Sequence, residues 1–211
     1  MTNSEKIKRL VVAGLITAII ILMGFTPLGY IKIGPVIEVT FLMIPVVIGA
    51  SVLGIEWGTI FGFIFGITSF FQCFGYSPFG TALFAINPFY TFLLCVIPRT
   101  LMGFLAGLIF KAISKIDKTK IISFIVTSLS GALLNTFFFT IMFILMFRNA
   151  TIGDTNLQNM PIFDVVFWLV TFNALLEVIV CGVIGTAISK VIVKFVFNSK
   201  KLSSKNQSIT K

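Results

Sequence analysis

The chain alternates between long apolar runs and short polar segments, and this pattern predicts six membrane-spanning helices. A helix needs about 20 residues to cross a hydrocarbon core of about 30 Å. We place the helices at about 7–25, 40–53, 57–74, 88–113, 120–147 and 162–197. The runs do not alternate apolar and polar residues as the strands of an outer-membrane barrel do. The expected fold is therefore an all-α integral membrane protein.

The domain organisation expected from this pattern is simple. One six-helix membrane domain covers residues 1–198, and the polar tail 199–211 is expected to be disordered. No small-residue cleavage site follows Phe25, so we interpret the first apolar segment as a retained span rather than a signal peptide. The predicted outer loops, 28–39, 75–87 and 148–161, are longer than the inner turn at 54–56 and could cover a pocket that opens outward.

Composition and charge support the membrane assignment. Of the 211 residues, 57% are hydrophobic and 11% are charged, which no soluble domain of this size would show. Three cations lie at the start of the first span, four lie around the turn between the fourth and fifth, and six lie late in the sixth or beyond it. Because cytoplasmic loops are positive, both termini are expected in the cytoplasm. The net charge of +9 therefore reflects topology rather than nucleic-acid binding.

Small residues recur at four-residue spacing on three of the predicted helices. In lipid such residues let helix backbones approach closely. We interpret the glycines of the third and fourth helices as contacts inside the bundle, whereas the small residues of the first helix could equally face a partner subunit. The sets are Gly58, Gly62 and Gly66 on the third helix, Gly103 and Gly107 on the fourth, and Ala13, Gly14, Thr17 and Ala18 on the first.

Arg99 lies deep in the fourth predicted helix, roughly 16 Å from its outer end. A charge at such a depth costs roughly 3 kcal/mol on insertion scales. Asn135 on the fifth helix reaches a similar depth, and Asn173 and Glu177 on the sixth are four residues apart and share a face. Because polar groups in lipid point to the bundle interior, we predict a pocket in which Arg99 holds the carboxylate or phosphate of a small anionic molecule.

Two interpretations of these polar residues stay open. Arg99 could form a structural ion pair with Glu177, or Glu177 could flank the guanidinium while a ligand occupies its other side. Nearer the predicted outer surface, Gln72, Asn87 and Tyr90 could each donate to a ligand, or could be interfacial residues.

The sequence carries no pattern for catalysis or metal binding. It has no histidine, and Cys73, Cys95 and Cys181 are widely spaced inside apolar runs, which is typical of small core residues rather than a metal or disulfide framework. Neither a G-x-x-x-x-G-K-[ST] phosphate loop nor the H-E-x-x-H and G-x-S-x-G motifs occur. We therefore expect no enzyme, no cofactor and no metal.

Several segments resemble the substrate-binding S components of energy-coupling factor (ECF) vitamin transporters. They are 34–40 (GPVIEVT), 44–50 (IPVVIGA), 53–58 (LGIEWG) and 62–66 (GFIFG), and the likeness covers about residues 10–195. It implies a prokaryotic plasma-membrane protein that binds one vitamin from outside. It also implies docking through the first helices on a membrane coupling subunit driven by two ATPase subunits, whose ATP hydrolysis topples the S component. The family's docking motif is usually two alanines four apart, and either Ala13 with Thr17 or Gly14 with Ala18 would replace it here.

Within that family, two segments look most like pantothenate-type members. They are 87–90 (NPFY) and 98–103 (PRTLMG). Pantothenate carries one carboxylate, which Arg99 would take, and hydroxyl and amide groups, which Asn135 and Asn173 would meet. The alternatives are riboflavin or another vitamin, a structural or assembly membrane protein, and a secondary transporter working alone. The last would show an internal repeat with matching broken helices, and Pro98 has no counterpart in the other half.

Overall fold

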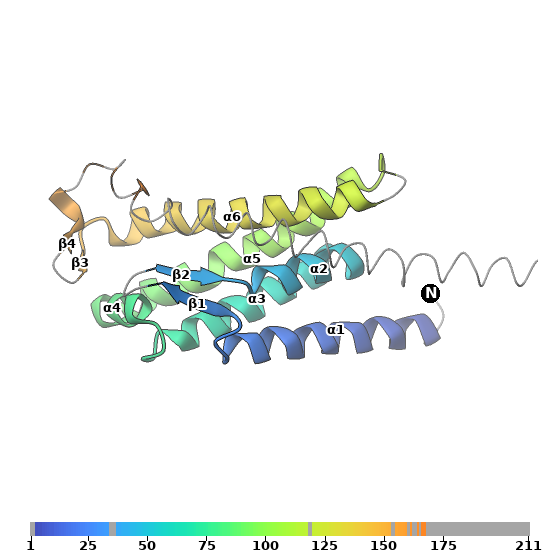
Figure 1. The fold of residues 1–211 in the computed structure, drawn as a ribbon, viewed down its shortest axis with the longest axis horizontal. Helices are drawn as coiled ribbons and strands as arrows, with labels where there is room; N and C mark the ends of the chain where they lie inside the picture. The colour runs from blue at the N-terminus through green and yellow to red at the C-terminus, as the bar shows by residue number, and fades with distance from the viewer. Residues whose placement is uncertain are drawn as a thin grey trace, which may run out of the picture.

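The computed structural model describes residues 3–33, 37–117, 120–152, 155–159, 161, 164, 166 and 167. Helices form its body, and most of them run along one long axis (Figure 1). They are α1 (Asn3–Gly24), α2 (Met43–Leu53), α3 (Ile55–Gln72), α4 (Pro78–Ile86), α5 (Pro88–Ile113) and α6 (Ile121–Phe147). Apart from residues 164, 166 and 167, the predicted sixth span lies outside the described residues, as does the tail 199–211.

Three of the described helices are long and apolar enough to cross a membrane: α1, α5 and α6. They correspond to the first, fourth and fifth predicted spans. The second predicted span is shorter than expected, because α2 has 11 residues and begins at Met43 rather than Thr40. The third is shifted by two residues to Ile55–Gln72.

Short antiparallel strand pairs occupy two of the predicted loops. Strand β1 (Tyr30–Ile33) pairs with β2 (Ile37–Thr40), and β3 (Thr151–Ile152) pairs with β4 (Thr155–Asn156) ahead of the 3-10 turn η1 (Leu157–Asn159). Thr40 pairs with Tyr30 in the first hairpin, which is why α2 starts later than the apolar pattern predicts.

The predicted loop 75–87 contains helix α4, which the sequence analysis missed. Ser77 begins it by accepting a hydrogen bond from the Gly80 amide at 2.9 Å, and Pro78 takes the first helical position. Asn87 does the same for α5, since its Oδ1 accepts from the amides of Phe89 and Tyr90 at 3.1 Å each. These caps explain why α5 starts at Pro88, as predicted.

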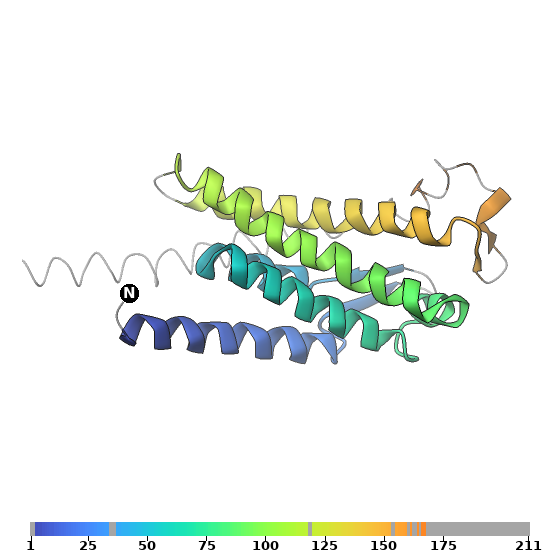
Figure 2. The ribbon, with the colours of Figure 1, turned by 180° about the vertical axis from the view of Figure 1, so that it is seen from behind.

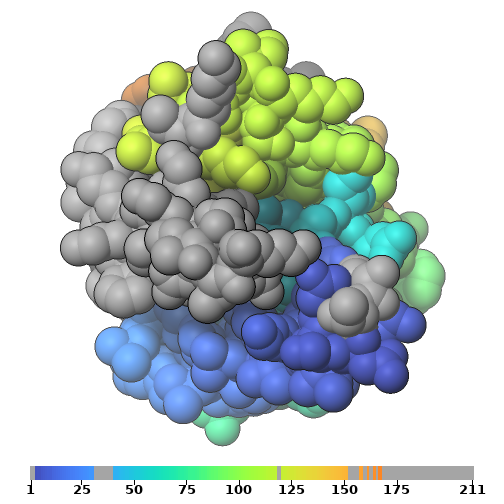
Figure 3. Space-filling model, turned by 90° about the vertical axis from the view of Figure 1, so that its right-hand side faces the viewer, coloured from blue at the N-terminus to red at the C-terminus, as the bar shows by residue number. Residues whose placement is uncertain are grey.

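The connections gather at the two ends of the bundle. In both views α4 and β3–β4 lie at one end, toward which β1–β2 extends, and we call this the loop end (Figures 1 and 2). The start of α1 and the α5–α6 connection lie at the other, the cation end, which faces the viewer in Figure 3. The cation end carries exposed side chains from two helices and the connection: Lys6, Lys8, Arg9, Lys111 and Lys115.

Helices α3 and α5 touch backbone to backbone through their glycines. A Cβ atom built on Gly58 would lie 2.5 Å from the Gly103 carbonyl oxygen, and one on Gly66 would lie 2.7 Å from the Val96 α-carbon. At the other end of the contact, a Cβ atom built on Gly107 would lie 2.7 Å from the Ile55 α-carbon. The prediction of internal packing by these glycines is confirmed, and the two helices are antiparallel.

Candidate functional site

Arg99 is buried in the middle of α5, with 8% of its surface exposed. Its Nη1 donates to the carbonyl oxygen of Leu94 at 2.8 Å. In an uninterrupted helix that oxygen would accept from the amide four residues later, but residue 98 is proline and has no N–H. One nitrogen of the guanidinium thus replaces the missing backbone donor.

The rest of the Arg99 guanidinium lies against two aromatic rings, and one of its N–H donors has no hydrogen-bond partner among the described residues. Its central carbon lies 4.8 Å from the ring centroid of Phe139 and 5.7 Å from that of Phe65, a favourable arrangement for a cation. Its Nε is buried and has no hydrogen-bond partner in the described part of the chain. The sequence analysis did not single out Phe139, although its place four residues after Asn135 puts both on one face of α6.

Ring contacts fix how α6 lies against α5. Residue numbers fall along α6 as they rise along α5, so the helices are antiparallel, and Arg99 meets the middle of α6. The contacts that establish this register are Tyr90 with Phe147 at 6.4 Å, Arg99 with Phe139 at 4.8 Å, and Phe110 with Phe124 at 4.8 Å.

Asn135 lies one turn from Phe139 on the face of α6 that meets α5. One turn further, a Cβ built on Gly131 would lie 3.9 Å from the Met102 sulfur, and Met102 is three residues after Arg99. Asn135 therefore lies at a level between Met102 and Arg99. It is 4% exposed, and its Oδ1 has no hydrogen-bond partner among the described residues.

Within the described part of the chain, a buried donor and a buried acceptor without hydrogen-bond partners thus lie at adjacent levels on α5 and α6. Each such group costs about 1–3 kcal/mol when left unpaired, so buried polar groups normally find partners. This arrangement suits a ligand that accepts from Arg99 Nε and donates to Asn135 Oδ1. Asn173 and Glu177 on the sixth predicted helix, which are also expected at this site, lie outside the described residues.

An apolar cluster separates this polar pair from the loop end. It consists of Leu83 on α4, Leu94 on α5, Phe143 and Phe147 on α6, and Leu157 in η1, all at most 2% exposed. Arg148 holds η1 in place by donating through Nη1 to the Leu157 carbonyl. Because the cluster excludes water from the space between Arg99 and the loop end, charge-assisted hydrogen bonds made by Arg99 are stronger than those at a surface.

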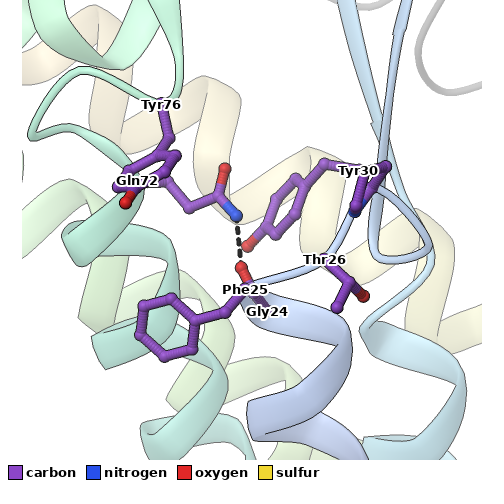
Figure 4. Close-up of a pocket in the computed structure, with 7 residues that line it drawn as sticks. Gly24, Phe25, Thr26, Tyr30, Gln72 and Tyr76 are labelled. Atoms are coloured by element: carbon purple, nitrogen blue, oxygen red, sulfur yellow. Dashed lines mark hydrogen bonds between the residues drawn. The ribbon is translucent and has the colours of Figure 1, made fainter.

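A cavity of about 500 Å³ opens at the loop end, among the end of α1, strand β1 and the end of α3 (Figure 4). Gln72 lines it and donates through Nε2 to the Gly24 carbonyl. The α3–α5 register places Gln72 about ten residues, or about 15 Å, nearer the loop end than Arg99. The lining residues are Gly24, Phe25, Thr26, Pro27, Tyr30, Gln72 and Tyr76.

Asn87 and Tyr90 also lie at the loop end, at the start of α5. The Asn87 Oδ1 is engaged by the helix cap, and the Tyr90 side chain is 42% exposed with its ring edge against Phe147. The structure therefore places Arg99 and Asn135 at adjacent levels of α5 and α6. It places Gln72, Asn87 and Tyr90 at the loop end, apart from these two, as the sequence predicts.

The four small residues of α1 divide between two faces. Ala13 is buried at 2% exposure and Thr17 is half-buried, whereas Gly14 and Ala18 are exposed. Among the described residues, a Cβ built on Gly14 would meet nothing within 4 Å. Gly14 and Ala18, one turn apart, thus form an open small-residue face.

Comparison with known proteins identifies relatives of the whole chain. Residues 8–189 match the family model described as "ECF transporter, substrate-specific component". The pantothenate transporter PanT of Leuconostoc mesenteroides subsp. mesenteroides is 30% identical over an alignment of 203 residues, which covers 90% of this chain and 95% of PanT. The crystal structure of the S component for biotin from an ECF-type ABC transporter superposes with a TM-score of 0.58 at 21% identity, covering 90% of this chain and 95% of that one. At that identity the likeness concerns the fold.

Proposed function

Because the chain belongs to the substrate-specific components of ECF transporters, we propose that it binds pantothenate for uptake and holds it with Arg99 and Asn135. Its family makes it a multi-pass protein of the cell membrane and a binding component rather than an enzyme. The choice of pantothenate among vitamins is supported by the similarity to PanT along nearly the full chain.

The observation that carries the proposed site is that two buried atoms, Arg99 Nε and Asn135 Oδ1, have no hydrogen-bond partner among the residues that the structure describes. The pantothenate carboxylate would accept from Nε, and a hydroxyl or amide N–H of the same molecule would donate to Oδ1. Charge-assisted hydrogen bonds of this kind are about twice as strong as neutral ones. The bond to Leu94 leaves Nε free to face the ligand.

The remaining predicted residues have secondary places in this proposal. Asn173 and Glu177 on the predicted sixth span would complete the pocket. Gln72, Asn87 and Tyr90 would meet the vitamin at the loop end, which we place outside the cell. The exposed lysines and Arg9 at the cation end support placing the termini in the cytoplasm. Residues 1–198 would form the membrane domain.

Energy for uptake would come from partners. We propose that Gly14 and Ala18 dock on the membrane coupling subunit, which two ATPase subunits drive, because this pair is exposed on α1 while Ala13 is buried. Small residues at four-residue spacing permit the close helix contact that such docking needs in lipid.

Calorimetric titration of pantothenate into the purified protein in nanodiscs tests the proposed substrate and site. We expect saturable binding, no binding of biotin or riboflavin, and a loss of affinity of about 30-fold or more for Arg99→Gln, since an unpaired ligand carboxylate costs at least about 2 kcal/mol. The matched control is Lys111→Gln, which removes an exposed cation from the same helix.

Two results would decide against parts of the proposal. If the protein bound another vitamin and did not bind pantothenate, the proposed substrate would be wrong. Unchanged pantothenate affinity in Arg99→Gln, together with reduced stability, would instead assign Arg99 to an internal ion pair with Glu177.

A further inference from the structure

Two cysteines that are 22 residues apart in the sequence meet in the folded chain. The Sγ atoms of Cys73, at the end of α3, and Cys95, in the outer half of α5, lie 3.9 Å apart. Neither is in a disulfide, and both are buried, at 4% and 5% exposure. Cys73 Sγ also donates to the Ser69 carbonyl oxygen at 3.6 Å. Their sequence separation gave no sign of this contact, because it arises from the antiparallel register of α3 and α5.

The backbone around the two thiols is tightly packed. A Cβ on Gly66 would lie 3.0 Å from the Cys95 carbonyl oxygen, and one on Gly80 would lie 2.8 Å from the Cys73 sulfur. The pair therefore lies where α3, α4 and α5 meet. A disulfide has an S–S distance of about 2.05 Å, so bonding requires the two sulfur atoms to approach by a little under 2 Å.

One of the two thiols has a route to the surface. Cys73 is the C-terminal cap of α3, and the turn that follows it, Phe74 to Tyr76, is exposed. Cys73 thus adjoins exposed backbone, whereas Cys95 lies inside α5. This asymmetry is what a pair with an attacking thiol and a resolving thiol requires.

We propose that Cys73 and Cys95 are a dithiol–disulfide modification site that reacts with low-molecular-weight disulfides. The Cys73 thiolate attacks the small disulfide, forms a mixed disulfide and releases one small thiolate. The Cys95 thiolate then attacks the Cys73 sulfur, closes the intramolecular disulfide and releases the second small thiolate. Two protein thiols are oxidised, one small disulfide is reduced to two thiols, and the two cysteine protons pass to the released thiolates or to solvent.

The resulting bond would join α3 to α5 across the segment that contains α4. Cys95 precedes Arg99 by four residues and so shares its face of α5. Oxidation would therefore restrain the part of α5 that leads to Arg99. The proposal itself concerns the two thiols and does not depend on which vitamin is bound.

The experiment uses the full chain with Cys181→Ser, so that two cysteines remain, in nanodiscs treated with 2,2′-dithiodipyridine. We expect two equivalents of pyridine-thione, a protein mass lower by two hydrogens, and a Cys73–Cys95 cross-linked peptide. After denaturation no thiol should react with a maleimide, and dithiothreitol should reverse these changes. The melting temperature of the oxidised protein should exceed that of the reduced protein, because the bond restricts the unfolded chain.

Single substitutions complete the test. Cys95→Ser should stop at a stable mixed disulfide on Cys73, whereas Cys73→Ser should react slowly or not at all, because Cys95 lies within α5 rather than beside the exposed turn. Mixed disulfides on both cysteines of the two-cysteine protein would overturn the proposal. So would thiols that react only after denaturation.

Discussion

Arg99 donates a hydrogen bond to the carbonyl oxygen of Leu94, in its own helix. This is the carbonyl that Pro98 leaves without a backbone donor. A proline inside a helix ordinarily leaves such an oxygen unpaired, and in lipid that costs several kcal/mol. Here the side chain of the next residue supplies the hydrogen. The same contact holds the guanidinium against the helix, while Nε has no hydrogen-bond partner among the described residues. We infer that Pro98 has a part in positioning the proposed ligand donor.

The first prediction follows from this relationship. In Pro98→Ala the new amide should bond to Leu94, the helix should gain stability, and the freed guanidinium should lose its fixed orientation. We expect a higher melting temperature together with weaker pantothenate binding, although the charge of Arg99 is unchanged. Thermal unfolding and calorimetry on the same preparation measure both. A rise in stability with unchanged affinity would show that the Leu94 contact does not position the ligand donor.

The second prediction concerns Gly62, whose α-carbon packs against the Arg99 backbone. A Cβ there would overlap the Arg99 carbonyl oxygen and lie 3.1 Å from the Thr100 α-carbon. Gly62→Ala should therefore separate α3 from α5 and lower the free energy of unfolding by about 1–3 kcal/mol, as overpacking does. Denaturant unfolding in detergent gives the value. Gly14→Ala is the matched control, because the same methyl meets nothing within 4 Å there. Equal effects at both positions would contradict the packing argument.

The third prediction separates a binding role for Asn135 from a structural one. Asn135→Leu removes a buried acceptor that has no partner in the described part of the chain, so the ligand-free protein should be as stable as before or more stable. Pantothenate affinity should nevertheless fall about tenfold or more, because a ligand donor loses its acceptor.

A neighbouring side chain provides the control for Asn135. Thr140 on the same helix is also buried with an unpaired hydroxyl among the described residues, but lies ~140° around α6 from Asn135. Thr140→Val should leave the affinity unchanged. If Asn135→Leu destabilised the protein and left binding intact, Asn135 would be a structural residue.

Much of the helical body could be predicted from the sequence, because apolar length and capping residues are local properties. Asn87 and Pro88 mark the start of α5, and the prediction of 88–113 agrees with the structure. The depth of Asn135 relative to Arg99 also followed from counting residues along two helices. Ser77 and Pro78 carry the same local signals for a helix start, whereas the apolar pattern alone predicts a loop over 75–87.

What could not be predicted depends on register between elements. The hairpin that pairs Tyr30 with Thr40 is invisible in the apolar pattern, since its strands are four residues each. The meeting of Cys73 with Cys95, and of Arg99 with Phe139, is set by how far one helix is displaced along another. The spacing of residues within one helix does not contain that information. The stripes of small residues therefore predict close helix contacts, but not which helix each stripe contacts.

The last prediction concerns the open face of α1. Gly14→Phe should leave pantothenate affinity unchanged, since Gly14 is exposed on α1 and a side chain there meets nothing within 4 Å. The bulky ring should hold the coupling subunit away, because helix association in lipid depends on close approach of backbones. We expect loss of co-purification with the coupling subunit and loss of pantothenate uptake by cells. The control is Ile19→Phe, which places the same ring on the same helix at an exposed position ~140° away. If Gly14→Phe kept co-purification and uptake while Ile19→Phe lost both, the docking face would lie around Ile19 instead.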